Sequence, residues 1–282
     1  MSPRELPRPV LKWAGGKTPL TERILQLLPK KIDAYYEPFF GGGAVFFALA
    51  REGRLRRAVL SDANEELINL YRALKSDVDA VVTELRKMTV SEEEYYRIRD
   101  LRPRSDAKRA ARTIYLNKTG FNGLYRVNRS GLFNVPYGRH VNPKICDEPN
   151  LRAVADVLTN LNVELLQQDF EQTCRLARSK DAVYLDPPYL PLSPTASFTS
   201  YDRHPFGLTE HERLARIFDE LTKRNVPAVL SNSCTPESER LYQAHAIEHP
   251  LVARNINRDA KKRGKIKEIL VRNQPACRSQ SR

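Results

Sequence analysis

The tetrapeptide Asp186–Tyr189 combines residue types that could do chemistry on an aromatic substrate carrying an amino group. Four apolar or aromatic residues, 182–185, precede it and predict a buried strand that ends at Asp186. Pro187 and Pro188 remove two backbone donors and fix φ, so the turn presents the carboxylate and free carbonyl oxygens. Because α/β sheets bind ligands at the carboxyl ends of their strands, these acceptors suit a substrate amine, and Tyr189 suits stacking on a base. A purely structural Pro-Pro turn is the alternative interpretation.

A glycine turn upstream forms a second candidate site. Residues 40–43, FGGG, stand between a predicted strand and a predicted helix that ends at Gly53. Glycines allow the backbone to approach a ligand closely at a helix N-terminus. Asp62 follows Gly43 by 19 residues, at the end of the next predicted strand, where an acid can bond ribose hydroxyls. Together these features predict a nucleoside-containing cofactor and leave NAD open; a plain helix N-cap is the alternative for Asp62.

The segment 11–20, LKWAGGKTPL, looks at first like the phosphate-binding loop of a nucleotide triphosphatase. That loop needs a glycine five residues before Gly16, so that backbone N–H groups can curl around the phosphates, and this chain has Leu11 there. The missing glycine argues against a triphosphatase. The pattern by itself leaves the ligand of Lys17 open.

Composition predicts a folded protein of a reducing compartment. The chain has 282 residues and 41% hydrophobic content, enough for one large domain or for a domain with an insertion. It contains no apolar run of about 18 residues and no apolar signal-peptide core at its N-terminus, so we expect no membrane partner and a cytoplasmic location. Its cysteines are scattered without CxxC or histidine spacing, which argues against a zinc site and a disulfide framework, and we expect no bound metal.

The net charge of +13 is concentrated in two segments. Residues 102–144 carry ten Lys or Arg against one acid, and residues 251–282 carry ten against two, so the remainder of the chain is slightly acidic. A local excess of this size favours a polyanion partner, and nucleic acid is the partner that we expect. A solvated basic surface is the alternative.

Hydrophobic spacing predicts an α/β protein. Apolar residues at helical spacing indicate helices between 64 and about 118, at 151–161 and at 209–225, the last with Thr209 and Glu212 as a capping box. Short strands are predicted after residue 34, at 58–61, within 162–170 and 181–189, and at 226–233. Residues 119–143, rich in Gly, Asn and Pro, read as loop or hairpin, and the tail after Asn273 reads as disordered. Alternating strands and helices favour a sheet with a substantial parallel part.

These motifs stand in the order found in a known family. The sequence resembles the Dam-type DNA adenine-N6 methyltransferases, the alpha-ordered amino-methyltransferases, over about residues 8–272. The resemblance rests on KWAGGK at 12–17, EPFFGGG at 37–43, SDANEELINLY at 61–71, NKTGFNGLYRVNRSGLFNVPYG at 117–138, DF at 169–170, DPPY at 186–189 and NINRDAKKRGKIKEILV at 255–271.

The resemblance implies a Rossmann-like S-adenosylmethionine-dependent methyltransferase sheet with an inserted helical and β-hairpin target-recognition domain. Residues 1–63 and 144–273 would form the catalytic domain, 64–143 the insertion and 274–282 a disordered tail. S-adenosylmethionine would be the cofactor, S-adenosylhomocysteine its product, and no metal would be needed. The implied cofactor-binding residues are Trp13 and Lys17 at the methionine end, the backbone of Phe40, Gly41, Gly42 and Gly43 along the cleft, Asp62 at the ribose, Asp169 and Phe170 at the adenine, and Asp186 beside the target base.

By the same resemblance, the reaction would be methyl transfer to the exocyclic N6 of adenine in duplex DNA, with GATC as the expected target. The implied catalytic residues are Asp186, Pro187, Pro188 and Tyr189. Asp186 and the Pro187 carbonyl would accept the two N–H bonds of the amine and free its lone pair for in-line attack. The base would be flipped out of the duplex to stack on Tyr189, with Phe198 and Tyr201 as candidates for the opposite wall.

Candidate DNA-binding residues lie in the hairpin and in the second basic segment. The resemblance implies Leu124 as a wedge in the base stack, Arg126 as a reader of guanine and Pro136 as a contact to a thymine methyl. The other candidates are Phe121, Asn122 and Asn128 for backbone or flanking bases, and Lys261, Lys262 and Arg263 for phosphates. A turn-shaping role is the alternative for each hairpin residue, and a solvated run is the alternative for the basic residues. We expect a monomer that acts on the nucleoid of a bacterium or on phage DNA.

Two rival functions share these features. An RNA or protein-amide methyltransferase would use the same sheet and cofactor, but Asp186 and the large basic insertion favour adenine in duplex DNA. A non-catalytic DNA-binding protein with a degenerate methyltransferase fold would lack some cofactor or catalytic positions, and this sequence retains each of them.

Overall fold

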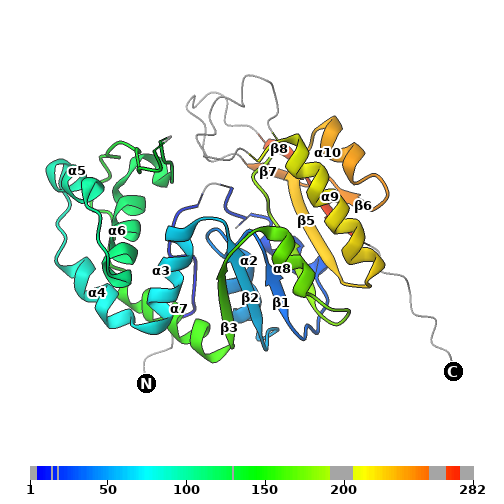
Figure 1. Ribbon diagram of the computed structural model, residues 1–282, viewed down its shortest axis with the longest axis horizontal. Helices are drawn as coiled ribbons and strands as arrows, with labels where there is room; N and C mark the ends of the chain where they lie inside the picture. Colours follow the sequence, from blue (N-terminus) through cyan, green and yellow to red (C-terminus); the bar gives the residue numbers. More distant parts are fainter. Residues whose placement is uncertain are drawn as a thin grey trace.

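Short apolar strands build a central, mainly parallel sheet (Figure 1). The structure is a computed structural model. It describes residues 5–13, 15–17, 19–128, 130–190, 206–253 and 265–273. Its strands are β1 (Tyr35–Glu37), β2 (Ala58–Asp62), β3 (Val163–Gln167), β4 (Ala182–Leu185), β5 (Ala228–Ser233), β6 (Ala246–Glu248), β7 (Leu251–Ala253) and β8 (Lys265–Arg272). Within these described residues the strand order is β3-β2-β1-β4-β5-β8-β6, with β7 also paired to β8. Neighbours among β1 to β5 pair in parallel, whereas β8 runs antiparallel to β5, β6 and β7.

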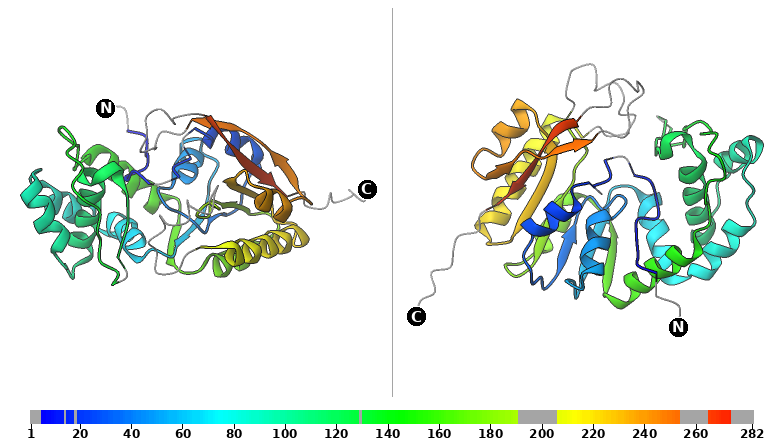
Figure 2. Two further views of the ribbon diagram at one scale, coloured as in Figure 1. Left: turned by 90° about the horizontal axis from the view of Figure 1, so that it is seen from above. Right: turned by 180° about the vertical axis from the view of Figure 1, so that it is seen from behind.

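Helices cover both faces of the sheet because successive strand residues point to opposite faces. Tyr35 of β1 packs into one apolar cluster together with α1 (Thr21–Leu27), α2 (Ala44–Arg51), α3 (Glu65–Ser76) and α7 (Glu148–Asn160). Tyr36 packs into a second cluster with α8 (Phe170–Leu176) and α9 (Leu208–Lys223), and α10 (Pro236–Leu241) adjoins that cluster. Figure 1 shows α8 and α9 in front of the strands, and the view from behind in Figure 2 shows α1 and α2 on the other side.

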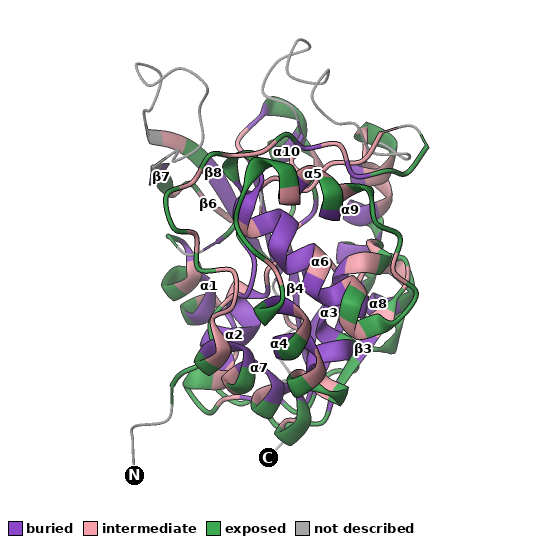
Figure 3. Ribbon diagram, turned by 90° about the vertical axis from the view of Figure 1, so that its left-hand side faces the viewer, coloured by how far each residue is buried: buried purple, intermediate pink, exposed green. Residues whose placement is uncertain are grey.

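A helical lobe extends from α3 on one side of the sheet (Figure 1). It contains α4 (Val78–Arg86), α5 (Glu92–Asp100), α6 (Asp106–Thr119) and the short helix η1 (Phe121–Gly123), followed by a hairpin. The lobe has a small core of its own, made of Tyr95, Ile98, Tyr115, Leu116, Phe133 and Val135. Figure 3 shows buried residues continuing from the sheet through α3 into α6, and α3 shares the first cluster with the strands. The lobe is therefore packed onto the sheet and not merely tethered to it.

Side-chain caps set the starts of the lobe's helices. Asn64, Asp77, Ser91 and Ser105 each accept the N–H of the residue three positions later. The predicted α/β class, the helical stretch from 64 to 118 and the strands at 58–61 and 226–233 are confirmed. The predicted capping box at Thr209 is wrong, because α9 already begins at Leu208 after Gly207 and Thr209 lies inside its first turn. The predicted tail, 274–282, lies outside the described residues.

Candidate functional site

The glycine turn at 40–43 and the tetrapeptide Asp186–Tyr189 lie together at the place in the sheet where the connecting helices change from one face to the other. β1 and β4 pair in parallel, so the glycine turn after β1 and the turn after β4 lie at the same edge of the sheet. The helix that follows β1, α2, covers one face, whereas α8, which precedes β4, covers the other. This is the topological switch point, where open α/β sheets bind ligands outside the carboxyl ends of their strands.

Asp186 is held by two donors from distant parts of the chain. Lys17 Nζ lies 2.7 Å from Asp186 Oδ1, and Ser231 Oγ donates to the same oxygen at 2.9 Å. The Lys17 side chain is only 6% exposed, also donates to the Gly15 carbonyl, and sits 4.6 Å from the centre of the Tyr189 ring. Burial raises the pKa of Asp186 above its ordinary value, and the Lys17 ammonium and the Ser231 hydroxyl offset part of that rise.

A polar triplet at the end of β5 braces the turn that follows β4. The buried residues Ser231, Asn232 and Ser233 each bond to one part of it. Ser231 reaches Asp186, Asn232 Oδ1 accepts the Leu190 N–H at 3.3 Å, and Ser233 Oγ donates to the Leu190 carbonyl at 2.8 Å. The sequence prediction missed this brace. Its signal was three polar residues closing an otherwise apolar strand.

Two further side chains complete the surroundings of the turn. The Tyr189 hydroxyl donates to Glu268 Oε2 at 2.6 Å, and burial raises the pKa of that phenol far above its ordinary value, so it stays a donor. Asn232 Oδ1 already accepts N–H groups, so its amide nitrogen faces His211 Nδ1 at 3.3 Å. This arrangement assigns the proton of the neutral His211 ring to Nε2. Burial lowers the pKa of His211 to about 4, so the ring is uncharged at neutral pH.

The glycine turn is shaped by Asp62 and covered by Trp13. Asp62 Oδ2 accepts the Gly41 N–H at 3.0 Å, and Oδ1 accepts the Asn64 N–H at 2.9 Å. A Cβ on Gly41, whose φ is +48°, would stand 2.8 Å from Trp13 Cδ1, so only glycine lets the indole lie this close. Because Asn64 is the N-cap of α3, the alternative interpretation of Asp62 as that cap is wrong.

Glu37 lies beneath this turn and was missed as a site residue. It is 3% exposed and accepts the Tyr35 hydroxyl at 2.9 Å, and burial raises its pKa well above the ordinary value for a glutamate. The Phe46 N–H, in the first turn of α2, also faces its carboxyl group. The side chain of Phe40 lies in the core against Tyr71, so only the backbone at Phe40 can contribute to the turn's surface, as expected.

Asp169 and Phe170 stand at the start of α8, which follows β3, the strand that pairs with β2. Asp169 caps the helix by accepting the Glu171 N–H at 2.9 Å and forms an ion pair with Arg213. The Phe170 ring stacks on Phe39, with centroids 5.3 Å apart, and the Arg213 guanidinium lies 4.2 Å from its centre. Phe39 and Arg213 are therefore additional candidates at this end of the site, which the sequence motifs did not single out.

In the hairpin, the predicted DNA-binding residues divide into exposed and structural positions. Phe121, Asn122 and Pro136 are exposed. The Phe121 N–H donates to the Pro136 carbonyl, and Asn122 has a φ of +55°. Leu124 is half-buried in the lobe's core. Asn128 Oδ1 accepts two N–H groups across the hairpin turn, which is the turn-shaping role named as its alternative.

Arg126 is partly held within the hairpin, and other predicted residues fall outside the described part. Arg126 Nε donates to Asn134 Oδ1 at 2.7 Å and Nη2 donates to the Asn134 carbonyl at 3.1 Å. These bonds orient the guanidinium along the hairpin. The predicted phosphate contacts Lys261, Lys262 and Arg263 and the predicted base-stacking walls Phe198 and Tyr201 lie outside the described residues.

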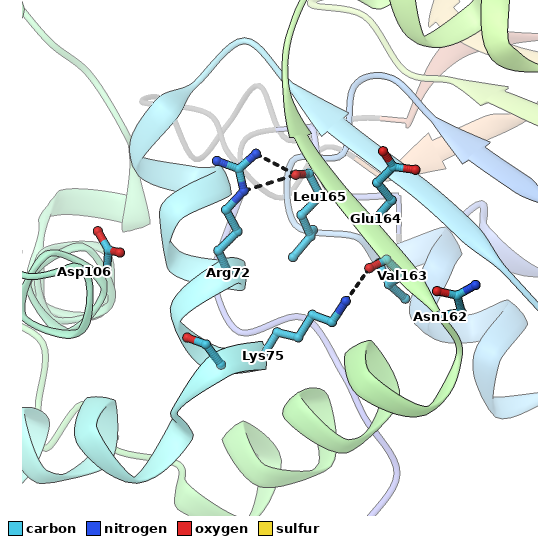
Figure 4. A pocket seen from close by; sticks show the side chains of 8 residues that line it. Arg72, Lys75, Asp106, Asn162, Val163, Glu164 and Leu165 are labelled. Carbon is cyan, nitrogen blue, oxygen red and sulfur yellow. Dashed lines mark hydrogen bonds between the residues drawn. The ribbon is translucent and has the colours of Figure 1, made fainter.

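A cavity of about 710 Å³ lies elsewhere, against the outer edge of β3. Figure 4 shows Arg72 donating to the Leu165 carbonyl and Lys75 donating to the Val163 carbonyl across it. These basic side chains cap the strand's outward carbonyls and so protect the sheet edge from pairing with another strand. The cavity's lining includes none of the predicted catalytic residues, so we do not assign the chemistry to it.

Among the residues that the structure describes, the fold brings together one set of potential metal ligands that spacing alone did not reveal. Ligand atoms of Cys234, Glu239 and His249 lie within 4.8 Å of one another. His249 Nε2 and Glu239 Oε1 are 2.8 Å apart, and Cys234 Sγ donates to the same oxygen at 3.8 Å. Hydrogen bonds between these half-buried and exposed side chains account for their proximity.

Comparisons with known proteins find relatives over nearly the full length of the chain. The family described as D12 class N6 adenine-specific DNA methyltransferase matches residues 13–256. The chain is 41% identical to the Type II methyltransferase M1.LlaDCHI of Lactococcus lactis subsp. cremoris, covering 94% of this chain and 95% of that protein. It is also 41% identical to the Type II methyltransferase M.MjaIII of Methanocaldococcus jannaschii, over 94% and 99% of the two chains. It is 36% identical to the DNA adenine methylase of Escherichia coli K12, over 95% and 96%. Within the part of the chain that the structure describes, no helix has the length and apolar character to span a membrane.

Proposed function

Because the chain belongs to the D12 class of N6 adenine-specific DNA methyltransferases, we propose that it methylates the exocyclic N6 of adenine within GATC in duplex DNA. The observation that carries the proposal is the position of Asp186. Its carboxylate stands at the switch point of the sheet, between Lys17 and Ser231 and beside two prolines without N–H groups. An acceptor fixed there, next to a glycine turn, suits an amine that must meet a nucleoside-containing cofactor.

The chain's groups fit S-adenosylmethionine along the edge of the sheet. The Lys17 ammonium has three donors, of which Gly15 and Asp186 take two, and the third is available for the cofactor's carboxylate. Asp62, whose two oxygens accept the Gly41 and Asn64 N–H groups, would hold the ribose hydroxyls. The half-buried Phe39 would meet the adenine, and Phe170, which is 4% exposed, would support Phe39 from the core. When bound, the cofactor supplies an electrophilic sulfonium methyl group.

Asp186 and the Pro187 carbonyl would accept the two hydrogens of the adenine amine. In its ionised form Asp186 is an acceptor only, and it pulls the amine's lone pair out of conjugation with the ring so that the nitrogen can attack in line. The brace from β5 fixes the turn before substrate arrives, so positioning rather than a strong base supplies much of the rate. A flipped adenine would stack on Tyr189, whose hydroxyl is anchored on Glu268.

Residues 64–143, which comprise α3 and the helical lobe, would recognise the target sequence as an inserted domain. Arg126 would read guanine, Leu124 would enter the base stack, and Pro136 would contact a thymine methyl. Phe121 and Asn122 would contact backbone or flanking bases, and the basic run after residue 257 would hold phosphates. We expect the enzyme to act as a monomer in the cytoplasm, without a metal.

The test is transfer of labelled methyl from S-adenosylmethionine to two unmethylated duplexes, one with GATC and one with that sequence scrambled. We expect label only in the GATC duplex, recovered as N6-methyladenine, and we expect Asp186→Ala to abolish transfer while it preserves binding of the duplex. Label in both duplexes would refute the GATC assignment and keep the chemistry. Label in neither, with label in an RNA substrate, would refute duplex DNA as the substrate.

A further inference from the structure

The N-terminal segment that holds Lys12, Trp13 and Lys17 touches two parts of the proposed site, the glycine turn and Asp186. Trp13 lies over the glycine turn, where a Cβ on Gly41 would stand 2.8 Å from its ring. Lys17 reaches Asp186 at 2.7 Å. The segment runs between the helical lobe and the sheet, seen as the dark-blue trace in the view from behind in Figure 2. A shift of this segment would therefore reach the glycine turn and Asp186 together.

A buried asparagine of the lobe clamps the beginning of this segment. Asn117, near the end of α6, is 3% exposed. Its Oδ1 accepts the Lys12 N–H at 2.9 Å, and its Nδ2 donates to the Lys12 carbonyl at 2.7 Å and to the Gly123 carbonyl at 2.8 Å. One carboxamide thus ties the segment to the first turn of the proposed DNA-reading hairpin. These three bonds need one acceptor and two donors on a short stem, and asparagine supplies that set.

Two other contacts reinforce the junction on the hairpin side. A Cβ on Gly123, whose φ is +65°, would stand 2.7 Å from Lys12 Cβ, so the hairpin backbone packs directly on the segment. The rings of Trp13 and Tyr125 lie with centroids 5.6 Å apart. Movement of the hairpin on a duplex would therefore be transmitted to Lys12 and Trp13.

A second asparagine holds the same N-terminal region without touching the hairpin. Asn150 of α7 is 2% exposed, accepts the Arg8 N–H at 3.0 Å and donates to the Arg8 carbonyl at 3.1 Å. The two clamps have the same chemistry, and they differ in that Asn117 alone of the pair also bonds to Gly123. Asn150 is thus a matched control for the loss of a backbone clamp.

We infer that Asn117 is a positioning residue that couples DNA engagement at the hairpin to the cofactor site, through Lys12, Trp13 and Lys17. This inference rests on the proposed function, because both ligands belong to it. Coupling between two sites is reciprocal and in proteins commonly changes affinity by about 5–150-fold. We therefore expect a substrate duplex to tighten the binding of S-adenosylhomocysteine to the wild-type enzyme by at least about fivefold, and S-adenosylhomocysteine to tighten the binding of the duplex equally.

The experiment is calorimetric titration of S-adenosylhomocysteine into the full-length enzyme, with and without a duplex that the enzyme methylates. We expect Asn117→Ala to bring the coupling factor to within about twofold of one, whereas Asn150→Ala keeps the wild-type factor. If Asn117→Ala does not fold, Gly123→Ala tests the same junction, because its Cβ would push the hairpin off Lys12. We expect the same loss of coupling in that variant.

Unchanged coupling in Asn117→Ala or Gly123→Ala would overturn the inference. It would indicate that the target base itself carries the coupling between the two sites. Equal losses in Asn117→Ala and Asn150→Ala would also overturn it, because they would indicate a general loosening of the N-terminal region. A wild-type enzyme that methylates DNA but shows a coupling factor near one would refute the inference alone. A wild-type enzyme that methylates nothing would refute the proposed function and the inference with it.

Discussion

Asn232→Ala should show that the bonds from β5 to the turn after β4 affect the rate of methyl transfer beyond their effect on the stability of the fold. Asn232 is fully buried at the carboxyl end of β5. Its removal leaves the Leu190 N–H, the Ser233 N–H and His211 Nδ1 without this partner. An unsatisfied buried polar group costs about 1–3 kcal/mol, so we expect the free energy of unfolding to fall by at least about 3 kcal/mol. Leu190 would keep the Ser233 bond to its carbonyl and lose the bond to its N–H, which loosens the turn, and a displacement near 1 Å at a reacting centre costs about 100-fold in rate.

Asn273→Ala is the matched control. Asn273 follows β8 and bonds to the amino end of β5. Asn273 is 2% exposed, accepts the Ala228 N–H at 2.8 Å and donates to the Val226 carbonyl and to Thr222 Oγ1. Its loss should lower the free energy of unfolding by a similar amount, at least about 3 kcal/mol, without touching the turn after β4.

The assay is single-turnover methyl transfer with saturating cofactor and duplex, at a temperature where urea titration confirms that both variants are folded. We expect the rate of Asn232→Ala to fall about 100-fold and that of Asn273→Ala to stay within about threefold of wild type. Equal rates in the two variants, whether both high or both low, would refute the view that β5 positions the catalytic turn.

Three further predictions follow from particular side chains. Lys17→Met removes the ammonium that lowers the Asp186 pKa, so the acid limb of the pH–rate profile should move to higher pH and the cofactor's KM should rise; an unmoved limb would contradict the pairing. His211 has a folded pKa of about 4, below its unfolded value, so stability is fully present above about pH 6.5 and should fall by about 3 kcal/mol as pH drops towards 4. His211→Gln should flatten that part of the urea-melt profile against pH. Dialysis against EDTA should leave methyl transfer unchanged, and loss of activity that Zn²⁺ restores would instead point to the cluster at Cys234.

The sequence predicts the parallel half of the sheet better than its antiparallel edge. β2, β4 and β5 are runs of apolar residues long enough to be recognised by composition alone. β6 and β7 have three residues each, and β6 is only half-buried, so neither carries a local period. Their pairing with β8 is a long-range contact, and no local pattern encodes it. The seven-residue helices α1 and α8 are likewise too short for a full amphipathic repeat.

The candidate site divides in the same way. The motif residues Asp186, Asp62 and Gly41 could be predicted because each motif is continuous in sequence and ends a recognisable strand. Their partners could not, since Ser231 lies 45 residues from Asp186 and Glu268 lies 79 residues from Tyr189. A polar residue at a strand end has many possible roles, and only the fold decides which group it meets.

The Asp-Pro-Pro-Tyr motif nevertheless implies that such partners must exist. The two prolines have no N–H groups, so the turn cannot hold itself by bonds from those nitrogens. Two of its fixed points are therefore the Asp186 side chain at one end and the Leu190 N–H and carbonyl at the other, and β5 binds all of these. Because β5 is the parallel neighbour of β4, its carboxyl end is the nearest place from which such bonds can come. A proline pair after a buried strand should thus be read together with polar residues closing the adjacent strand, and the triplet Ser231–Ser233 is that second half of the motif.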